Sequence, residues 1–333
     1  MGWIGGLLAV CAFTIFPIFG HYARSGPLHG PGLVLSGAGA LGSPPGALEW
    51  MRRRVTGPVA GRHGNLVVLR ASGSDLYDLP LYRNGSFASV QTILIPPCAQ
   101  GDALVRAAHV VGGADAVFFA GGDQANYVRW KNSPLIDAVK AVYARGGAVG
   151  GGSAGLAIQG AVVFDSVAAD RYDVETHTAD TVRFPLEGRI SFTTGLFDWP
   201  ALTDTITDTH FVARDRFGRL VVFLARILKD GLLPGRAVVY GLGVDQGSAV
   251  LVDPDGMATV VQRPDSHGAY LVRANALPAL VPDGGFRYTV DVAHVAGNGT
   301  RFDLLHKRAP GPWYKVTVDS SVPGFYSRSP YLP

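Results

Sequence analysis

Short apolar runs recur through the first half of the chain, each ending at glycine or polar residues. Runs of this kind fit strands buried on both faces of a parallel sheet, and segments with helical spacing of apolar residues lie between them. The alternation predicts an α/β fold with helices on both faces of the sheet. Strands are expected at 32–39, 65–70, 90–96, 116–120 and 148–149, and helices from 47 onward and at 103–111 and 134–145.

From residue 236 the pattern changes to short β-like runs separated by turns such as the one at 254–256. We expect these runs to extend or cap the same domain, so that residues 32–333 form a single α/β domain with a β-rich C-terminal part. The expected strands lie at 237–240, 248–252, 258–262, 269–273 and 288–292.

An uncharged apolar run at 3–20 precedes the sheet pattern, and a glycine- and proline-rich segment at 25–32 follows it. The run is just long enough to span a bilayer, and its glycines and Pro17 also suit a cleavable signal peptide. Residues 1–31 are therefore expected to be a leader and linker. The protein is expected to be exported to a periplasmic or extracellular space or anchored to a membrane, with a cytoplasmic protein as the alternative. A chain starting near Ser25 is then expected to be soluble and active.

Composition narrows the function classes. The chain has 333 residues, 47% of them hydrophobic, so it can bury a large core, and its net charge is only +3. Basic residues are dispersed apart from the run at 52–54, which argues against a nucleic-acid partner. No metal-ligand spacing occurs, and the glycines at 37–42 lack the acidic residue of a dinucleotide site, so no cofactor is implied. Of the two cysteines, Cys11 lies in the leader, so Cys98 is expected to be a lone thiol without an internal disulfide.

A glycine-flanked serine follows the expected strand at 148–149, in the sequence G-G-G-S-A-G-L at 150–156. Small neighbours allow a sharp strand-to-helix turn that holds Ser153 in a strained conformation with its hydroxyl exposed. The next amide, that of Ala154, is then able to stabilise an oxyanion. Ser153 is therefore the candidate nucleophile. The alternatives are a chance motif in a chain with 44 glycines, or a serine that caps a helix.

A histidine, two acids and three arginines cluster at 207–220, just before an apolar helical run at 221–228. An imidazole can accept a serine proton near neutral pH and return it to a leaving amine. His210 is therefore the candidate base, and a packed or surface histidine is the alternative.

A third cluster lies at the end of the buried strand pattern at 116–120, in the turn G-G-D-Q at 121–124. Open α/β sheets bind ligands at such strand ends. The amides of Gly122 and Asp123 are candidates for the second oxyanion donor, and Gln124 is a candidate for a hydrogen bond to substrate. The alternative is an ordinary turn in which Asp123 caps a helix.

These motifs, F-F-A-G-G-D-Q at 118–124, G-G-S-A-G at 151–155 and D-T-H-F-x-x-R-x-R-x-G-R-L at 208–220, resemble the cyanophycinase and dipeptidase E group of serine peptidases, family S51. The resemblance extends from about residue 33 to 249 and includes 241–249, which is similar to a G-x-G-x-D-E-x-x-A segment of that group. It implies a flavodoxin-like, class I glutamine-amidotransferase-like fold, a Ser-His-acid catalytic set, and exopeptidase or isopeptidase chemistry next to aspartyl residues. The family usually has Thr or Ser where Gly152 stands and often Glu where Gln246 stands; we expect neither position to touch the nucleophile or the base.

The acid of the catalytic set is expected between nucleophile and base, in the stretch 165–204, because a carboxylate orients the imidazole and stabilises its charged form. The candidates are Asp165, Asp170, Asp173 and Glu175. Similarity to the family's acidic position favours Asp170, with Asp165 second.

The resemblance also assigns the segment around His210, including Asp208, to the substrate pocket. Guanidinium groups bind carboxylates bidentately, so Arg214 and Arg216, and less strongly Arg219, are candidates to bind the free carboxylate of an aspartyl residue. The alternatives are surface arginines, or an ion pair between Arg219 and Asp215.

The expected partner is a peptide or cyanophycin-like substrate with aspartyl residues, and a homodimer is a further expectation. Two other function classes stay open, because a fold does not fix a function. One is a catalytically silent ligand-binding protein on the same fold, and the other is a serine esterase for small substrates.

Overall fold

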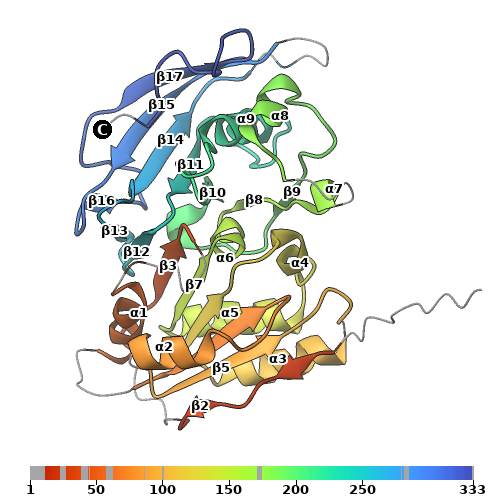
Figure 1. Ribbon diagram of the computed structural model, residues 1–333, viewed down its shortest axis with the longest axis vertical. Helices are drawn as coiled ribbons and strands as arrows, with labels where there is room; N and C mark the ends of the chain where they lie inside the picture. Colours follow the sequence, from red (N-terminus) through yellow and green to blue (C-terminus); the bar gives the residue numbers. More distant parts are fainter. Residues whose placement is uncertain are drawn as a thin grey trace, which may run out of the picture.

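The computed structural model describes residues 12–22, 28–38, 44, 46–57, 63–85, 87–99, 101–170, 175–278, 280 and 285–331. Two β-sheets form its framework, and helices pack on them (Figure 1). The strands of the larger sheet are β1 (Thr14–Ile15), β2 (Phe19–Gly20), β3 (Gly32–Ser36), β4 (Asn65–Arg70), β5 (Ser89–Leu94), β6 (Ala116–Phe119), β7 (Ala148–Gly152), β12 (Ser248–Val252), β13 (Met257–Gln262) and β16 (Arg301–Asp303). Their order is β1-β5-β4-β6-β7-β3-β12-β13-β16, and β2 also pairs with β5.

The core of this sheet is the parallel set β5-β4-β6-β7-β3, which confirms the predicted fold class. Strands β5, β4, β6 and β7 stand in the order in which a flavodoxin-like sheet begins, and β3 takes the fifth place. The carboxyl ends of β6, β7 and β3 therefore lie side by side at one edge. This edge carries two of the three motifs that the sequence singled out.

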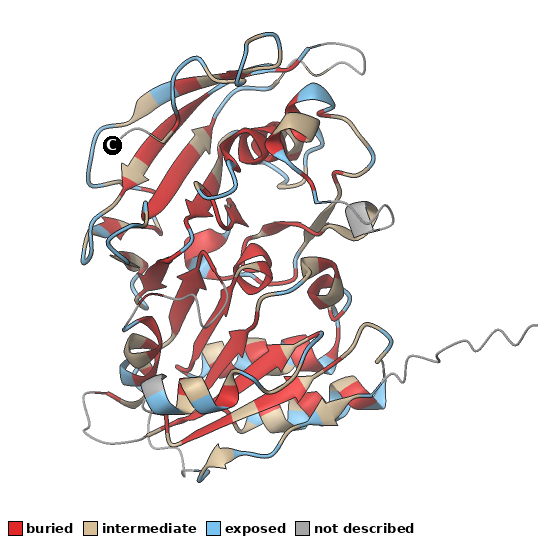
Figure 2. Ribbon diagram, in the orientation of Figure 1, coloured by how far each residue is buried: buried red, intermediate tan, exposed pale blue. Residues whose placement is uncertain are grey.

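Helices cover both faces of the larger sheet because alternate strand residues point to opposite sides. Val117 and Phe119 pack in one core with α3 (Asp102–Gly112) and α5 (Pro134–Ala144). Phe118 packs in the other core with α1 (Ala47–Thr56) and Leu81 of α2 (Asp78–Gly85). Burial accordingly follows the strands on both faces (Figure 2).

A second sheet was not predicted. Its strands are β8 (Val162–Phe164), β9 (Phe192–Thr194), β10 (Thr205–Asp208), β11 (Val239–Val244), β14 (Ala269–Ala274), β15 (Arg287–Val295) and β17 (Tyr314–Asp319). The order is β17-β15-β14-β11-β10-β8-β9, with β8, β10 and β11 parallel. The strands expected after residue 236 are confirmed, but they divide between the two sheets. Because β8, β9 and β10 are only three or four residues long, their apolar periodicity is too short to recognise.

Short helices and turns lie between the strands, and the one after β7 leads from the larger sheet to the second sheet. They are α4 (Gln124–Val128), α6 (Ala154–Ala157), α7 (Val167–Asp170), α8 (Thr178–Arg183) and the 3-10 turn η2 (Pro200–Leu202). The longest helix, α9 (Phe217–Lys229), packs on β11, β14 and β15 with one apolar face. Its first residues follow the loop that carries His210, so α9 anchors that loop to the second sheet.

The described part of the expected leader lies along the edge of the larger sheet. Thr14 pairs with Leu94 and Phe19 with Val90, and the amide of Phe16 donates to the carbonyl of Thr92 at 3.0 Å. Residues placed before the domain by the sequence thus add β1 and β2 to its sheet. Within the described ranges, no helix combines the length and the apolar character needed to cross a membrane.

The expectation of a lone thiol is wrong at Cys98, which is disulfide-bonded. The pairing of Thr14 with Leu94 brings the N-terminal segment close to the loop that carries this cysteine. The other cysteine of the sequence, Cys11, lies outside the described residues.

We expect deletion of residues 1–24 to destabilise the domain, contrary to the simple leader hypothesis. The deletion uncovers the backbone groups of β5 and creates an open sheet edge, which favours aggregation. The melting temperature should fall by roughly 3–6 °C, measured by circular dichroism, and light scattering should show more aggregate. The matched control is the full chain with Cys98→Ala, which separates loss of the disulfide from loss of strand pairing. An unchanged melting temperature would show that β1 and β2 add nothing to stability.

Candidate active site

Ser153 lies on a sharp turn between β7 and α6, with φ of 53° and ψ of −119°. A serine with positive φ is strained, and the tight packing of its neighbours enforces the turn. A Cβ on Gly155 would lie 2.1 Å from the carbonyl oxygen of Phe119, and one on Gly151 would lie 2.2 Å from the carbonyl oxygen of Gly155. The side chain of Ser153 makes no capping hydrogen bond to α6, so the reading of Ser153 as a helix cap is wrong.

His210 follows β10 and places its ring against the serine. The distance from His210 Nε2 to Ser153 Oγ is 2.9 Å. The two residues come from different sheets, yet both backbones are held by one turn after β3. The amide of Ser153 donates to the carbonyl of Ser36 at 3.2 Å, and the amide of His210 donates to the carbonyl of Gly37 at 2.9 Å. This turn fixes the distance between the two candidate catalytic groups.

The third member of the set is Gln246, in the turn between β11 and β12. Its Oε1 lies 3.0 Å from His210 Nδ1. With an oxygen acceptor there, Nδ1 carries the proton and the lone pair of Nε2 faces the serine hydroxyl. The expectation that position 246 touches neither nucleophile nor base is therefore wrong. Sequence reasoning noted the segment 241–249 but not that its turn returns to the histidine.

The acids expected at this position have other surroundings. Asp165 is buried and accepts hydrogen bonds from the hydroxyls of Ser191 at 2.5 Å and Thr193 at 2.8 Å, which tie β9 to the end of β8. Glu175 pairs with arginines. The side chain of Asp170 and the whole of Asp173 lie outside the described residues. Nδ1 of His210 faces the β11–β12 turn. The side-chain amide of Gln246 therefore occupies the position beside Nδ1 that was predicted for an acid.

The surroundings of His210 favour its neutral form. Burial lowers the pKa of the imidazole below its ordinary 6.5, the hydrogen bond that Nδ1 donates to Gln246 opposes that shift, and the charges of Arg214 and Arg216 add to it. A neutral imidazole is the form that can accept a proton from serine. His210 is thus suited to act as a general base at neutral pH.

Two groups of contacts hold the segment that follows His210. Asp245, which is buried, accepts hydrogen bonds from the amides of Val212 at 3.0 Å and Ala213 at 3.1 Å. The hydroxyls of Tyr326 and Tyr331, from the C-terminal tail, donate to Asp215 Oδ1 at 2.7 and 2.8 Å. The tail therefore supports the histidine segment. No local sequence signal marks this role of the tyrosines, whereas Asp245 lies in a segment that the resemblance includes.

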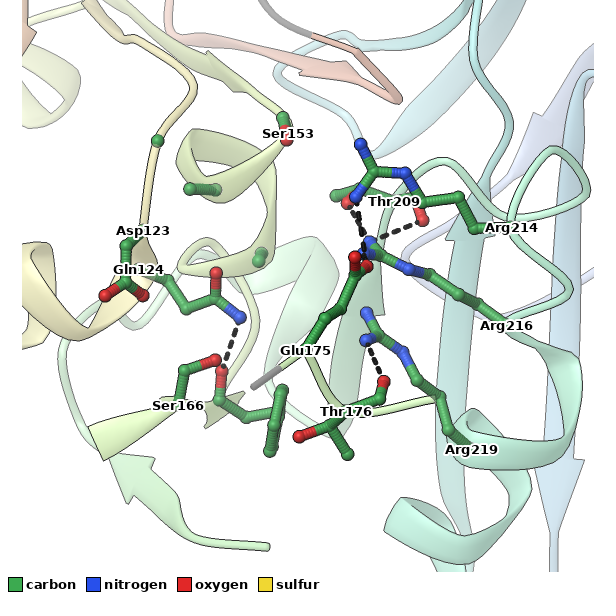
Figure 3. Close-up of a pocket in the computed structure, with 14 residues that line it drawn as sticks. Asp123, Gln124, Ser153, Ser166, Glu175, Thr176, Thr209, Arg214, Arg216 and Arg219 are labelled. Atoms are coloured by element: carbon green, nitrogen blue, oxygen red, sulfur yellow. Dashed lines mark hydrogen bonds and ion pairs between the residues drawn. The ribbon is translucent and has the colours of Figure 1, made fainter. Parts of the chain in front are cut away.

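A cavity of about 370 Å³ opens beside Ser153. Gly122, Asp123 and Gln124 line one side of it, Ala154 lies next to the serine, and the arginine segment lies opposite (Figure 3). All three candidate oxyanion residues thus face the same space. Within the described ranges, no three His, Cys, Asp or Glu side chains meet in a way that could hold a metal ion.

Two residues of the G-G-D-Q turn have structural contacts as well. The carboxylate of Asp123 accepts from the amide of Ala125 at 3.0 Å, so Asp123 caps α4 as the alternative reading expected. The Nε2 of Gln124 donates to the carbonyl of Phe164 at 3.3 Å. Gln124 also lines the cavity, as expected for a residue that contacts substrate.

Asp208 does not belong to the cavity lining, contrary to its expected contact with substrate. It is buried at the end of β10 and accepts from Arg219 Nε at 2.8 Å, while Arg219 Nη2 bonds its other oxygen. Arg219 Nη1 also donates to the carbonyl of Thr176 at 2.9 Å. The pair is a bidentate internal ion pair, because β10 and α9 meet there; the suggested pairing of Arg219 with Asp215 is also wrong.

Arg216 and Arg214 face the cavity with Glu175 between them. Arg216 is buried and donates to the carbonyl and hydroxyl oxygens of Thr209 at 3.0 and 2.9 Å. Arg214 is half-exposed, and its Nη1 donates to Glu175 Oε1 at 3.0 Å. All three expected arginines line the cavity, although an acid of the chain already contacts each of them: Glu175 contacts Arg214 and Arg216, and Asp208 contacts Arg219.

The electrostatics of this group keep Glu175 and Arg216 charged at neutral pH. Burial acts to raise the pKa of Glu175, but the hydrogen bond and charge of Arg216, with the charge of Arg214, bring it down to about 2. Burial and the charge of Arg219 lower the pKa of Arg216 to about 10. The cavity therefore combines fixed positive and negative charges rather than a plain positive field.

Comparison with known proteins gives distant structural matches. No family model matches the chain. A peptidase from an acI-B1 Actinobacterium is 18% identical, with a TM-score of 0.46 over 72% of this chain and 90% of that one. A candidate peptidase E protein from Listeria monocytogenes EGD-e is 11% identical, with a TM-score of 0.40 over 70% of this chain and 98% of that one. Identities this low assign no residue role to this chain.

We expect the pH profile of any reaction at Ser153 to report His210. Activity should fall as pH drops through the pKa of His210, so the acid limb of kcat/KM has its midpoint below 6.5. Gln246→Glu places a negative charge at Nδ1, stabilises the imidazolium, and should move that midpoint to higher pH. Gln91→Glu, the same change at the far edge of the sheet, is the control and should leave it unchanged. A midpoint that does not move in Gln246→Glu would refute the assignment of Gln246.

Proposed function

We propose that the protein is a serine hydrolase that cleaves peptide or isopeptide bonds. One observation carries this proposal: the hydroxyl of Ser153, on a strained turn at the mouth of the cavity, lies 2.9 Å from Nε2 of His210. A nucleophile and a base in hydrogen-bond contact, with the base oriented by a third group, are the shared feature of serine hydrolases on unrelated folds.

In this mechanism, His210 takes the proton of Ser153 while Oγ attacks the carbonyl carbon of the substrate. The tetrahedral oxyanion lies between the amide of Ala154 and the G-G-D turn, with Gly122 or Asp123 as second donor. The imidazolium then gives its proton to the leaving amine, and an acyl-enzyme remains on Ser153. Water, deprotonated by His210, attacks the acyl carbon and releases Ser153.

Gln246 has a positioning role in this scheme. Its carbonyl holds Nδ1–H and so fixes the tautomer and the ring orientation, as the asparagine of a Cys-His-Asn set does. A neutral amide adds no charge to stabilise the imidazolium. We therefore expect slower proton transfer than in a set with a carboxylate at this position.

For substrate, we propose aspartyl peptides or β-aspartyl isopeptides, including cyanophycin-like material, as expected for a member of family S51. Three motifs that resemble that family, around Gln124, Ser153 and His210, meet at one cavity. Arg214 and Arg216 face this cavity and already bind a carboxylate, that of Glu175, which supports a carboxylate as the group that they bind in a substrate.

A second candidate is a catalytically silent binding protein on the same fold, and the neutral Gln246 favours it. An esterase is a third, since an ester leaving group needs less help from the imidazolium than an amine. A fluorophosphonate probe separates the enzymes from the binding protein, and β-aspartyl, α-aspartyl and ester substrates separate peptidase from esterase.

We also propose that the protein is exported or membrane-anchored. The apolar run at 3–20 and the disulfide at Cys98 support this proposal, because disulfides persist mainly in oxidising compartments.

Ser153→Ala should abolish fluorophosphonate labelling and reduce kcat by on the order of 10³-fold or more, with an unchanged melting temperature. His210→Ala should cost a similar factor. The double variant should be no worse than either single variant, because both residues act in one proton transfer. Ser166→Ala, a serine in the same cavity, is the control and should retain labelling. Labelling of Ser153→Ala, or additive losses in the double variant, would contradict the nucleophile-base pair.

Arg214→Gln should reduce kcat/KM for an aspartyl substrate by roughly tenfold, since charge-assisted hydrogen bonds to a half-exposed arginine are worth about that factor. The asparaginyl analogue should be a poor substrate already and lose little more. The exposed Arg236→Gln, outside the cavity, is the matched control. Equal losses on both substrates would make Arg214 a structural residue.

A further inference from the structure

The carboxylate of Glu175 stands inside the candidate substrate cavity. Arg214 Nη1 and Arg216 Nη2 both donate to its Oε1, at 3.0 and 2.5 Å, so two guanidinium groups converge on one oxygen atom (Figure 3). Glu175 lines the same cavity as Ser153. The chain thus supplies its own carboxylate to the arginines that face the nucleophile.

The neighbouring ion pair of Asp208 and Arg219 is buried and bidentate, and it serves as a comparison for the contacts of Glu175. Asp208 and Arg219 are 3% and 4% exposed and share two parallel hydrogen bonds through both carboxylate oxygens. The side chain of Glu175 is 42% exposed and that of Arg214 is 45% exposed, and their contact uses a single oxygen. Solvent screens such a contact, and a single-oxygen geometry is easier to exchange than a bidentate one.

Arg216 makes the exchange selective. Its side chain is 9% exposed, and two of its hydrogen bonds go to Thr209, so it stays in place and needs an acceptor at Nη2. A second ion pair of Arg216, with Asp208, is longer, at 3.7 Å from Nη1 to Oδ1, and Asp208 is already bound to Arg219. Loss of Glu175 without a replacement therefore leaves Nη2 of a buried guanidinium without an anionic acceptor, which is costly. A ligand that carries a carboxylate can replace Glu175 at that point, whereas a neutral ligand cannot.

We propose that Glu175 is a specificity-determining residue, an internal carboxylate that occupies the carboxylate site of Arg214 and Arg216 and that an acidic ligand displaces. Glu175 therefore weakens the binding of every acidic ligand by competition. It also leaves neutral ligands without an open arginine pair. The proposal deepens the proposed function, but its binding part does not depend on catalysis.

The experiment measures binding of succinate, a dicarboxylate probe, by calorimetry to the full chain carrying Ser153→Ala. Adding Glu175→Gln keeps a hydrogen-bond acceptor for Arg216 and removes the competing charge. Succinate should then bind roughly five- to tenfold tighter, the range expected when a partly screened charge contact is removed. Binding of the neutral probe succinamide should not change. Glu187→Gln, which neutralises a glutamate paired with Arg189 outside the cavity, is the matched control and should leave succinate binding unchanged.

Weaker or unchanged succinate binding in Glu175→Gln would overturn the proposal, and so would failure of every variant to bind succinate. Weaker binding would mean that Glu175 positions the arginines. If Glu175→Gln does not fold, Glu175→Asp keeps the charge on a shorter side chain that holds Arg216 less well. Succinate should then bind about twofold tighter or more, and no gain would overturn the proposal.

The two proposals fail separately. With Ser153 intact, Glu175→Gln should lower KM for an aspartyl substrate and leave kcat unchanged. A protein that shows tighter succinate binding without hydrolysis or fluorophosphonate labelling would retain the carboxylate site and lose the hydrolase assignment. If the protein hydrolyses aspartyl substrates and Glu175→Gln does not change succinate binding, the hydrolase assignment is retained and the proposal for Glu175 is lost.

Discussion

The candidate site depends on the backbone turn that follows β3. Ser36 and Gly37 accept the amides of Ser153 and His210, and the amide of Gly37 donates to the carbonyl of Ser248 at 2.9 Å. These bonds tie the end of the larger sheet to the loop that leaves the second sheet. A side chain at Gly37 would lie 2.0 Å from the carbonyl oxygen of Asp245, so only glycine allows this approach. The contact between nucleophile and base is therefore a property of the junction between two sheets.

A neutral residue completes the set at Ser153 and His210. The desolvation that keeps His210 uncharged also makes its imidazolium costly, and the amide of Gln246 lowers that cost less than a carboxylate would. His210 is thus present as the free base at neutral pH, but it is a weaker base, because the imidazolium that forms on proton transfer is poorly stabilised. Among the proposed functions, a poorly stabilised imidazolium limits amide hydrolysis most, because the leaving amine needs a proton from His210. It limits ester hydrolysis less, and it does not affect a protein that only binds a ligand.

The three arginines of the motif have three different environments. Arg219 is bound to a buried aspartate, Arg216 is buried but faces the cavity, and Arg214 is half-exposed. Their spacing in the sequence does not distinguish them, because the loop after His210 enters α9 irregularly, with Asp215 at φ of 44°. The carboxylates of Asp123 and Glu175, which line the same cavity, partly offset the charge of these arginines, so recognition of an acidic ligand depends on exchange of partners rather than on a net positive field.

Local features of this protein follow from short segments of its sequence. Short apolar runs predicted the strands of the parallel sheet, and the glycines around Ser153 predicted the strained turn, because both follow from sterics and burial within a short segment. The tertiary structure decided the contacts between segments: the division of the C-terminal strands between two sheets, the return of Gln246 to His210 from 36 residues away, and the contact of Glu175 with Arg216 across 41 residues. Which of several acids or amides reaches a given nitrogen depends on how short strands pair across the junction, and no periodic pattern in the chain encodes that pairing.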